Sequence, residues 1–579
     1  MKVRCHWRSC VRFLRGLQRG VGERRFLEFS YDIYYMHSGN MTKLVNGTTY
    51  VNDMLNMTED EPKSSDVSEV TEFFNGLNIL VTGGSGFLGK LLIDKLLRSC
   101  PKMGKLYMLM RAKKGKTPEE RFKEHFQDIV YERLKKERPD FLDNIIMIEG
   151  DTSLHDLGIS MVDREKLIAN IHVVFHGAAT VRFDESLRQA VNINVRGTKL
   201  MLLLAKQMKN LKAIVHVSTA YSHCIKNVIE EKFYEAPMDP DRVLELCEML
   251  DDTLLEHMTT KIIDKWPNTY AFSKAMGEEV VRVYSKGMPT CIVRPSIMIA
   301  TYREPAPGWI NNYYGATGVV VGAGIGLLHS LHCEANNIAD IIPADYVINN
   351  IIVAAYDIAK QWEEKLKEIE ELDEKPEIKL VPPIYNSVSS CQQPISWSTF
   401  MEMNERHGRA IPSAVVMWHY AFTLNKYLWV HNLFCFLFHT IPAIIVDALA
   451  TMTGRKPVLY KAYQKIHKFS GVISYFCTQQ WTFNNDKLLE LWKRTSLPDR
   501  EKFDFNLRSL DWEDYFYHHV RGIRVHILKD PLDTIEVGRV KLRRLKIAHW
   551  TIVTILGSLL LWGLYNLMQI LLSWCPRFN

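Results

Sequence analysis

A glycine-rich segment between an apolar run and a helical pattern is the feature of this chain that most constrains its fold. Residues 79–81 are apolar and are followed by Thr82, and Gly83, Gly86 and Gly89 then come at intervals of three. Gly83 permits a tight turn, Gly86 lets the backbone approach a phosphate, and Gly89 lets a helix pack closely on the strand. The N-terminus of that helix attracts an anion. The spacing predicts a strand, loop and helix that bind a dinucleotide pyrophosphate, in preference to an ordinary glycine-rich turn.

Apolar runs alternate with helical patterns through the first half of the chain. The runs lie at residues 106–111, 145–151, 173–179, 213–219 and 290–295. This alternation is typical of a parallel sheet covered by helices on both faces. The sequence therefore predicts an α/β fold, a Rossmann-type doubly wound parallel sheet, over residues 70–390. Residues 361–379 are dense in Glu and Lys, which favours a solvated helix or linker.

Composition narrows the functional classes. Among 579 residues the formal net charge is only +6, and no basic motif is interleaved with aromatic residues, so a nucleic-acid partner is not expected. The 11 cysteines are dispersed, without a Cys-x-x-Cys pair. This pattern is typical of reduced cytosolic thiols, and it predicts no structural metal.

The first 69 residues differ from the rest of the chain. They are rich in arginine at the start and lack the compact apolar core of a cleaved secretory signal. We expect a disordered extension over residues 1–69, with a mitochondrial targeting segment as the alternative. Three Asn-x-Thr triplets there are discounted as glycosylation sites, because a cytosolic segment is not glycosylated.

The C-terminal part is mainly helical and rich in aromatic residues, and we expect a second domain over residues 391–530. Residues 427–450 are apolar but contain two histidines, a proline and Asp447, which favours a buried or membrane-surface helix pair over a membrane crossing. Residues 547–574 contain no Asp, Glu, Lys or Arg and would extend about 40 Å as a helix. They predict a transmembrane anchor, or alternatively a hairpin within one leaflet.

The orientation of the anchor follows from its flanking charge. Five basic residues lie between positions 539 and 546, directly before the apolar segment. Because positive residues remain on the cytoplasmic side, the large N-terminal part is expected to face the cytosol.

Two segments carry candidate catalytic groups. Tyr270 and Lys274 are four residues apart, so one helical face presents both, and a nearby ammonium is expected to lower the pKa of the phenol. Two further Tyr-x-x-x-Lys pairs in the chain are attributed to chance. Thr219 ends the fifth apolar run, where a hydroxyl would face the ligand crevice, although a Ser-Thr pair can also merely form a turn.

The end of the second apolar run bears on the choice of cofactor. An acidic residue there would bind a ribose 2′-hydroxyl, but this chain has Arg111, followed by Lys113 and Lys114. A guanidinium suits a 2′-phosphate, so NADP is favoured over NAD. The alternative is an ordinary basic loop.

Taken together, these motifs resemble those of the extended short-chain dehydrogenases/reductases. More narrowly, Pro305-Ala306-Pro307-Gly308-Trp309 and the later Thr453-Gly454-Arg455-Lys456-Pro457 are similar to the eukaryotic, insect-like fatty acyl-CoA reductases. The similarity extends from about residue 72 to the C-terminus. It implies NADPH as the cofactor and reduction of a long-chain fatty acyl-CoA to a primary fatty alcohol through an aldehyde, without a metal.

The same resemblance assigns roles to residues. It implies that Thr219, Tyr270 and Lys274 are catalytic, that Asp151 meets the adenine, that Ala178 and Ala179 flank the ribose and nicotinamide, and that Asn194 is mainly a structural support. The full set of implied cofactor-binding residues is Thr82, Gly83, Gly86, Phe87, Leu88, Gly89, Arg111, Asp151, Ala178, Ala179, Asn194, Lys274, Pro295 and Ser296.

Two other functions remain open at this stage. A membrane-bound sterol dehydrogenase also joins such a domain to apolar sequence, and a non-catalytic dinucleotide-binding membrane protein could share the fold. The bilayer is an expected partner, at the endoplasmic reticulum or peroxisome. Acyl chain length and oligomeric state are not specified by the sequence.

Overall fold

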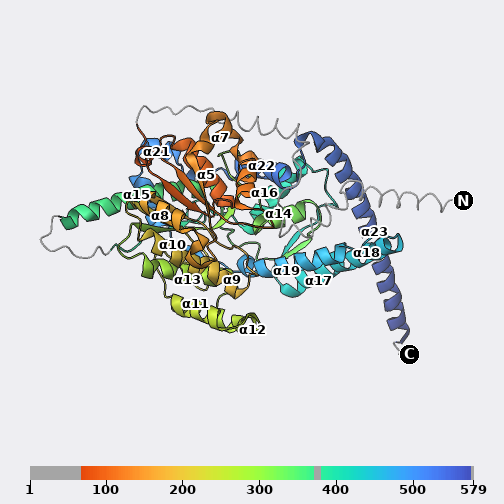
Figure 1. The fold of residues 1–579 in the computed structure, drawn as a ribbon. Coiled ribbons are helices and arrows are strands. Elements are labelled where there is room, and N and C mark those ends of the chain that lie inside the picture. Colours follow the sequence, from red (N-terminus) through yellow and green to blue (C-terminus); the bar gives the residue numbers. More distant parts are fainter. Residues whose placement is uncertain (1–66, 371–379, 575–579) are drawn as a thin grey trace.

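A seven-stranded parallel sheet forms the centre of the computed structural model, which describes residues 67–370 and 380–574 (Figure 1). The strand order is β11-β7-β5-β4-β1-β2-β3, so the order reverses between β1 and β4. A crevice at the carboxyl ends of strands at such a reversal is where doubly wound sheets bind ligands. The predicted fold class is confirmed. The strands are β1 (Ile79–Thr82), β2 (Leu106–Met110), β3 (Ile145–Glu149), β4 (Val173–His176), β5 (Ala213–Val217), β7 (Thr290–Pro295) and β11 (Ile384–Ser387).

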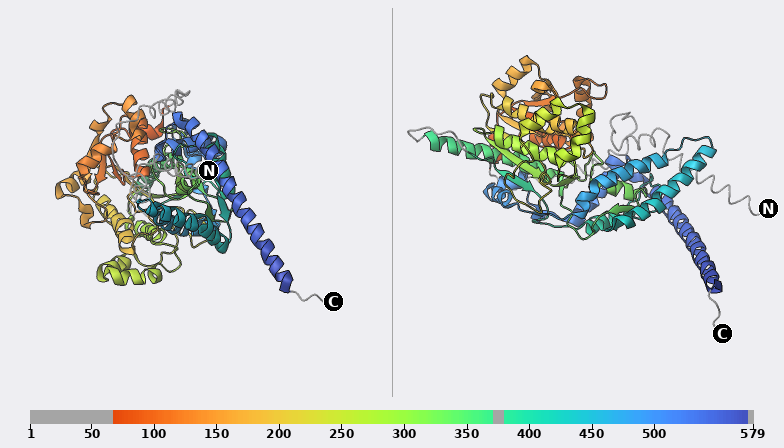
Figure 2. Two further views of the ribbon diagram at one scale, coloured as in Figure 1. Left: turned by 90° about the vertical axis from the view of Figure 1, so that its right-hand side faces the viewer. Right: turned by 90° about the horizontal axis from the view of Figure 1, so that it is seen from below.

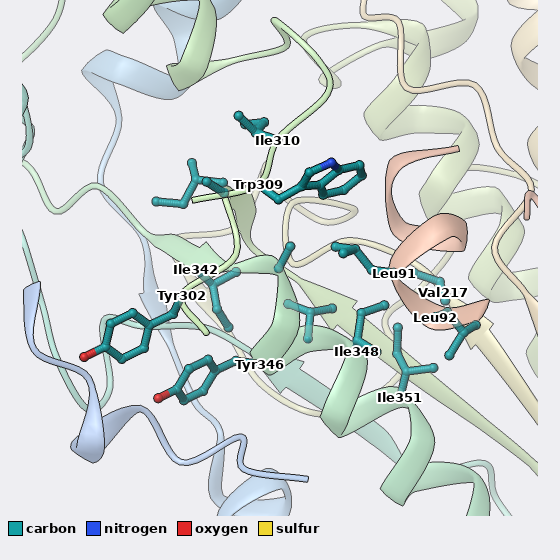
Figure 3. Packing of buried hydrophobic residues seen from close by; sticks show 14 of the residues in the cluster. Leu91, Leu92, Val217, Tyr302, Trp309, Ile310, Ile342, Tyr346, Ile348 and Ile351 are labelled. Atoms are coloured by element: carbon teal, nitrogen blue, oxygen red, sulfur yellow. The ribbon is translucent and has the colours of Figure 1, made fainter. Parts of the chain in front are cut away.

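Helices cover both faces of the sheet because its strands are apolar on both sides. On one face, α5 and α15 pack against Val81, Met108 and Val293. Figure 3 shows part of this core, including Leu91 and Leu92 of α5 and Ile348 and Ile351 of α15. On the other face, α10 and α13 pack against the alternate strand residues. The helices of this part are α4 (Glu69–Phe73), α5 (Phe87–Ser99), α6 (Pro118–His125), α7 (Glu132–Glu137), α8 (Met161–Asn170), α9 (Leu187–Val191), α10 (Gly197–Ala205), α11 (Pro240–Met249), α12 (Asp252–Ile263), α13 (Thr269–Tyr284), α14 (Ala316–Gly324) and α15 (Ala344–Glu370).

The C-terminal part is interwoven with the sheet domain. The described residues form three two-stranded sheets. Two of them join the halves of the chain: β9 (Ser330–His332) pairs with β12 (Thr423–Asn425), and β6 (Val228–Ile229) pairs with β13 (Thr482–Phe483). The third pairs β8 (Ile297–Ile299) with β10 (Ile341–Pro343). The helices here are α16 (Trp397–Ala410), α17 (Leu428–Cys435), α18 (Ile441–Met452), α19 (Leu459–Thr478), α20 (Asp486–Arg494), α21 (Leu497–Lys502), α22 (Trp512–Gly522) and α23 (Ile535–Trp574).

Two predicted segments lie partly outside the described residues. Residues 1–66 of the predicted extension lie outside the described residues, and Ser68 caps the first turn of α4. The charged segment at 361–379 continues α15 as far as Glu370, and residues 371–379 lie outside the described part.

Two apolar helices project from the body (Figure 2). Residues Leu428–Met452, comprising α17, the π-helical turn η5 (Phe436–Thr440) and α18, are long and apolar enough to cross a bilayer, and so are Leu532–Leu572, which include most of α23. No part of the apolar α23 window is buried in the protein. The helix begins at Ile535, earlier than the predicted anchor, so the basic run and the apolar segment form one continuous rod.

Candidate functional site

The glycine loop lies at the carboxyl end of β1, against the carboxyl end of β4. Gly83 has a φ of +73°, and a Cβ there would lie 2.7 Å from the backbone nitrogen of Ala178. A Cβ on Gly89 would lie 2.3 Å from the carbonyl oxygen of Gly83. Only glycine fits either position, whereas Gly86 is exposed and precedes the first turn of α5. The loop thus leaves the N-terminus of α5 open to an anion, as a pyrophosphate site requires.

The Pro305–Trp309 motif supports this loop from behind. The ring of Trp309 is buried and stacks on Phe87, the first residue of α5, with 5.5 Å between ring centroids. Gly308 has a φ of +75°, and a Cβ there would lie 2.2 Å from the carbonyl oxygen of His518 in α22. The motif therefore joins the C-terminal part to the cofactor loop, and Phe87 acts as packing.

A buried hydrogen-bond chain fixes the two strand ends relative to each other. The Thr82 hydroxyl lies 2.8 Å from Nδ1 of His176 and accepts a hydrogen bond from the backbone N–H of Ala178. Nε2 of His176 lies 3.2 Å from the Thr198 hydroxyl. Burial lowers the pKa of His176 to about 3, so the ring is neutral. His176 was not predicted as a site residue; its place at the end of β4 was the available signal.

Asn194 connects three elements around the candidate site. Its side-chain oxygen accepts from the Thr180 N–H at 3.0 Å, and its amide donates to the Ser273 hydroxyl at 2.9 Å. That hydroxyl donates to the Tyr270 carbonyl at 3.0 Å. Asn194 lies in a π-helical turn, η4 (Asn192–Arg196), a type of turn frequent at functional sites. These contacts make Asn194 a support of the helix that carries Tyr270.

The structure brings Thr219, Tyr270 and Lys274 together at the carboxyl end of β5. Thr219 lies beside the Tyr270 side chain, close enough to affect the pKa of that phenol. Lys274 is buried, and its ammonium donates to the Val217 carbonyl at 2.8 Å. Pro295, at the end of β7, accepts from the Thr219 hydroxyl at 3.4 Å, and Ser296 follows it. An ammonium has three donors, so Lys274 can still donate to a ligand.

The pKa of Tyr270 is not lowered as the sequence predicts. Desolvation raises it to about 12, and the neighbouring Thr219 hydroxyl opposes this rise only in part. The prediction considered the neighbouring charge and neglected burial. The phenol is consequently protonated at neutral pH, which suits a group that donates a proton during reduction.

The pKa of Lys274 shifts in the opposite direction. Burial lowers its pKa to about 8, and the negative charge of Glu278 opposes this shift. Glu278 is itself buried, one helical turn further along α13, and is paired with Arg294 and hydrogen-bonded by Ser218. The charge on Lys274 is therefore sensitive to pH just above neutrality.

A group of basic side chains surrounds the end of β2. Arg111 pairs with Asp151 at 3.0 Å, and Arg121 of α6 donates to the Arg111 carbonyl and to the Ser85 hydroxyl of the glycine loop. Burial, together with the positive charges of Arg111 and Arg121, lowers the pKa of Lys113. Positive charge is thus concentrated beside the loop. Arg121 was missed because it is eleven residues beyond the end of β2 and returns to it only when α6 folds back.

Aromatic side chains enclose the other side of Tyr270. Phe183 stacks on Tyr270 with 5.3 Å between centroids, and Phe476 of α19 lies 5.3 Å from Phe183. Phe476 also contacts Tyr221, which meets Trp481. The C-terminal part therefore contributes an apolar wall beside Tyr270, a feature that the sequence does not reveal.

Comparisons with known proteins identify related sequences. Two family models match this chain, and both are described as "Male sterility protein". The first, an NAD-binding model, matches residues 81–351, and the second matches residues 438–530. The chain is 38% identical over 537 residues to "Fatty acyl-CoA reductase wat" of Drosophila melanogaster, covering 93% of this chain and 100% of the relative. It is 33% identical to "Fatty acyl-CoA reductase 1" of Homo sapiens, covering 88% and 97% of the two chains.

Similarity to solved structures is weaker. The reductase domain of a nonribosomal peptide synthetase from Mycobacterium tuberculosis has a TM-score of 0.49 and 16% sequence identity, covering 83% of this chain and 99% of that one. The extent and identity of the sequence matches carry the conclusion: this chain belongs to the fatty acyl-CoA reductases, within the extended short-chain dehydrogenases/reductases, and is an oxidoreductase with a nicotinamide cofactor.

Proposed function

We propose that this protein reduces long-chain fatty acyl-CoA to primary fatty alcohol with NADPH, through an aldehyde. The carrying observation is the assembly of Thr219, Tyr270 and Lys274 at the carboxyl end of β5, beside the glycine loop. The loop fits the cofactor, because Gly83 and Gly89 let it pack against neighbouring backbone with no room for a Cβ, and this packing holds the N-terminus of α5 open to a pyrophosphate. Bound NADPH supplies the reducing equivalent.

The protein residues then have defined tasks. Tyr270 and Thr219 direct hydroxyl groups at the thioester oxygen, and Tyr270 donates its proton as negative charge develops there. Lys274 compensates the charge that forms on Tyr270 and donates to the cofactor ribose. The hemithioacetal then loses CoA as its thiol, which takes the hydroxyl proton, and the same groups serve the resulting aldehyde, whose reduction would use a second NADPH.

Expression of the full chain in yeast tests this proposal. We expect new long-chain fatty alcohols in the lipid extract, and their absence from cells that express a Tyr270→Phe variant. Oxidation of a 3-hydroxysterol with NAD, without alcohol formation, would instead favour the sterol dehydrogenase. An intact protein that binds NADPH and produces neither product would favour the non-catalytic alternative.

The basic residues around β2 support NADPH as the cofactor, with Arg111 and Arg121 as the candidate ligands of its 2′-phosphate. We expect Arg121→Ala to raise the KM for NADPH roughly 10- to 100-fold, because a hydrogen bond to a charged group contributes about 1.5–3 kcal/mol. The KM for NADH is the internal control and should change little. An equal rise in the KM for both cofactors would mean that Arg121 supports the structure of the glycine loop and does not bind the 2′-phosphate.

A pH dependence follows from Lys274. Its charged form predominates below a pKa of about 8, whereas Tyr270, with a pKa of about 12, keeps its proton. We expect kcat/KM to be level from pH 6.5 to 7.5 and to fall about tenfold per unit well above pH 8, as the ammonium is lost. Lys274→Arg should remove this decline even if it lowers the rate. A decline that persists in the arginine variant would exclude Lys274 as its source.

The location proposed for the enzyme is a membrane of the endoplasmic reticulum or peroxisome, with α23 as the anchor and the sheet domain in the cytosol. The basic residues between positions 539 and 546 support this orientation. Protease treatment of sealed microsomes should degrade the sheet domain and spare the apolar part of α23.

A further inference from the structure

The helix formed by α17, η5 and α18 buries its polar face and exposes its apolar face. Its buried face carries His431, Cys435, His439 and Ala443, at intervals of four residues. Its exposed face carries large apolar side chains, among them Trp429, Leu433, Phe436, Ile444, Ile445 and Met452. A water-exposed helix has the reverse arrangement, and contiguous apolar patches of this kind mark interaction sites.

The histidines of the buried face form hydrogen bonds within the protein. Nε2 of His439 accepts the backbone N–H of His329 at 2.9 Å, and its Nδ1 lies 3.0 Å from Nε2 of His467 in α19. His431 lies 2.7 Å from the Ser330 hydroxyl. Although Cys435, His439 and His467 are close enough to hold a metal ion, both ring nitrogens of His439 are already engaged. These groups bind the helix to the body.

The exposed apolar face consequently has no partner among the described residues. The position of α23 indicates what covers this face. The base of α23 is held to the body, because Lys541 donates to the Ala414 carbonyl and a Cβ on Gly538 would lie 2.0 Å from the Pro412 carbonyl oxygen. If α23 enters a bilayer, the body is held at the surface of that bilayer. In Figure 2, α17 and α18 project on the side of the body from which α23 leaves.

A membrane crossing by this helix conflicts with its contacts. Asp447 in α18 accepts the backbone N–H groups of Val458, Leu459 and Tyr460, which begin α19. Helix α19 therefore returns alongside α18, and it carries exposed Lys461 and Lys468. Crossing would place these charges in hydrocarbon, which is costly. Lying in the interfacial plane lets the apolar face enter lipid while the lysines remain at the headgroups.

We propose that the protein contacts the bilayer twice: α23 crosses it, and the helix Leu428–Met452 lies in the plane of the cytosolic leaflet with its apolar face inserted. This second contact fixes the orientation of the body on the membrane. Helix α19 then connects the lipid surface to the candidate site. Near its start Tyr463 stacks on His439, and near its end Phe476 contacts Phe183 in the apolar wall beside Tyr270.

Photolabelling by lipid tests the contact in the full-length protein. Proteoliposomes of phosphatidylcholine with a diazirine in its acyl chain are irradiated, and labelled peptides are mapped by mass spectrometry. We expect label in residues 428–452 as well as in 547–572, and none at the exposed Met161 and Val162 of α8. Label confined to α23, or crosslinks between copies of the chain at 428–452 in place of lipid, would overturn the proposal.

A pair of matched variants tests the surface. Phe436→Glu with Ile445→Glu should remove most of the label from residues 428–452 and leave that of α23 unchanged, because both side chains are exposed and their loss does not disturb the core. Met161→Glu with Val162→Glu is the control and should change neither. Unchanged lipid label at 428–452 in the first variant would contradict the inserted face.

A glycosylation site separates the in-plane arrangement from a crossing. Gly454, between α18 and α19, has a φ of +73°, which asparagine tolerates. Gly454→Asn with Lys456→Thr and Pro457→Ala creates an acceptor there, since a proline directly after the threonine would hinder glycosylation. We expect no modification of this acceptor in microsomes, since both ends of the helix remain cytosolic. Its glycosylation would show that the helix crosses.

Discussion

Replacement of Tyr270 by phenylalanine is expected to reduce fatty alcohol formation by at least 10²–10³-fold, while NADPH binding is retained. Losing one preorganised donor to a developing oxyanion typically costs this factor. The ring itself can remain, because its stacking on Phe183 and the Asn194–Ser273 support do not involve the hydroxyl. Single-turnover reduction of palmitoyl-CoA and fluorescence titration with NADPH measure the two effects separately.

The control for this variant is Phe183→Leu, which alters the wall of Tyr270 and keeps the phenol. We expect it to change the KM for acyl-CoA more than the chemical step. If Tyr270→Phe retained most of its single-turnover rate, another group would have to donate the proton, and the assignment of Tyr270 would be wrong.

Replacement of Gly89 by alanine is expected to abolish measurable cofactor binding. The added methyl group would lie 2.3 Å from the Gly83 carbonyl oxygen and 2.5 Å from the Gly84 Cα, both backbone atoms. The glycine loop must then move away from α5, which costs about 1–3 kcal/mol of stability and removes the pyrophosphate cradle. Isothermal titration with NADPH and thermal unfolding in detergent report the two consequences.

Gly471→Ala is the matched control. Gly471 lies within α19, and a Cβ there meets no atom within 4 Å. This substitution should leave NADPH affinity unchanged and stabilise the helix by up to about 1 kcal/mol. Normal affinity in the Gly89→Ala variant would mean that the loop has space that the described backbone does not provide.

The parts of the site that depend on local spacing were predictable from sequence. The glycine turn, the four-residue spacing of Tyr270 and Lys274, and the position of Thr219 after its strand all follow from one helix or one strand end. Parallel strands then bring these ends to one edge of the sheet, so the gathering of the three residues required only the fold class.

Features that depend on long-range packing were not predictable. The pKa of Tyr270 is set by burial among residues that include a C-terminal helix, and Arg121 reaches the glycine loop only through the placement of α6. Strand β11 was also missed, because its four residues follow a charged segment and owe their pairing to β7. The inward histidines His431 of α17 and His439 of η5 broke the apolar pattern for a reason that only their partners in the fold explain.

Transfer of deuterium tests the central claim most directly. The full-length protein in lipid is given palmitoyl-CoA and NADPH that carries deuterium at both C4 positions, and the alcohol is examined by mass spectrometry. We predict hexadecanol with two deuterium atoms on C1 from the unaltered enzyme, and at least about 100-fold less of it from Tyr270→Phe. Equal amounts of dideuterated alcohol from both proteins would contradict the role of Tyr270, and an absence of deuterium in the product would contradict reduction by NADPH.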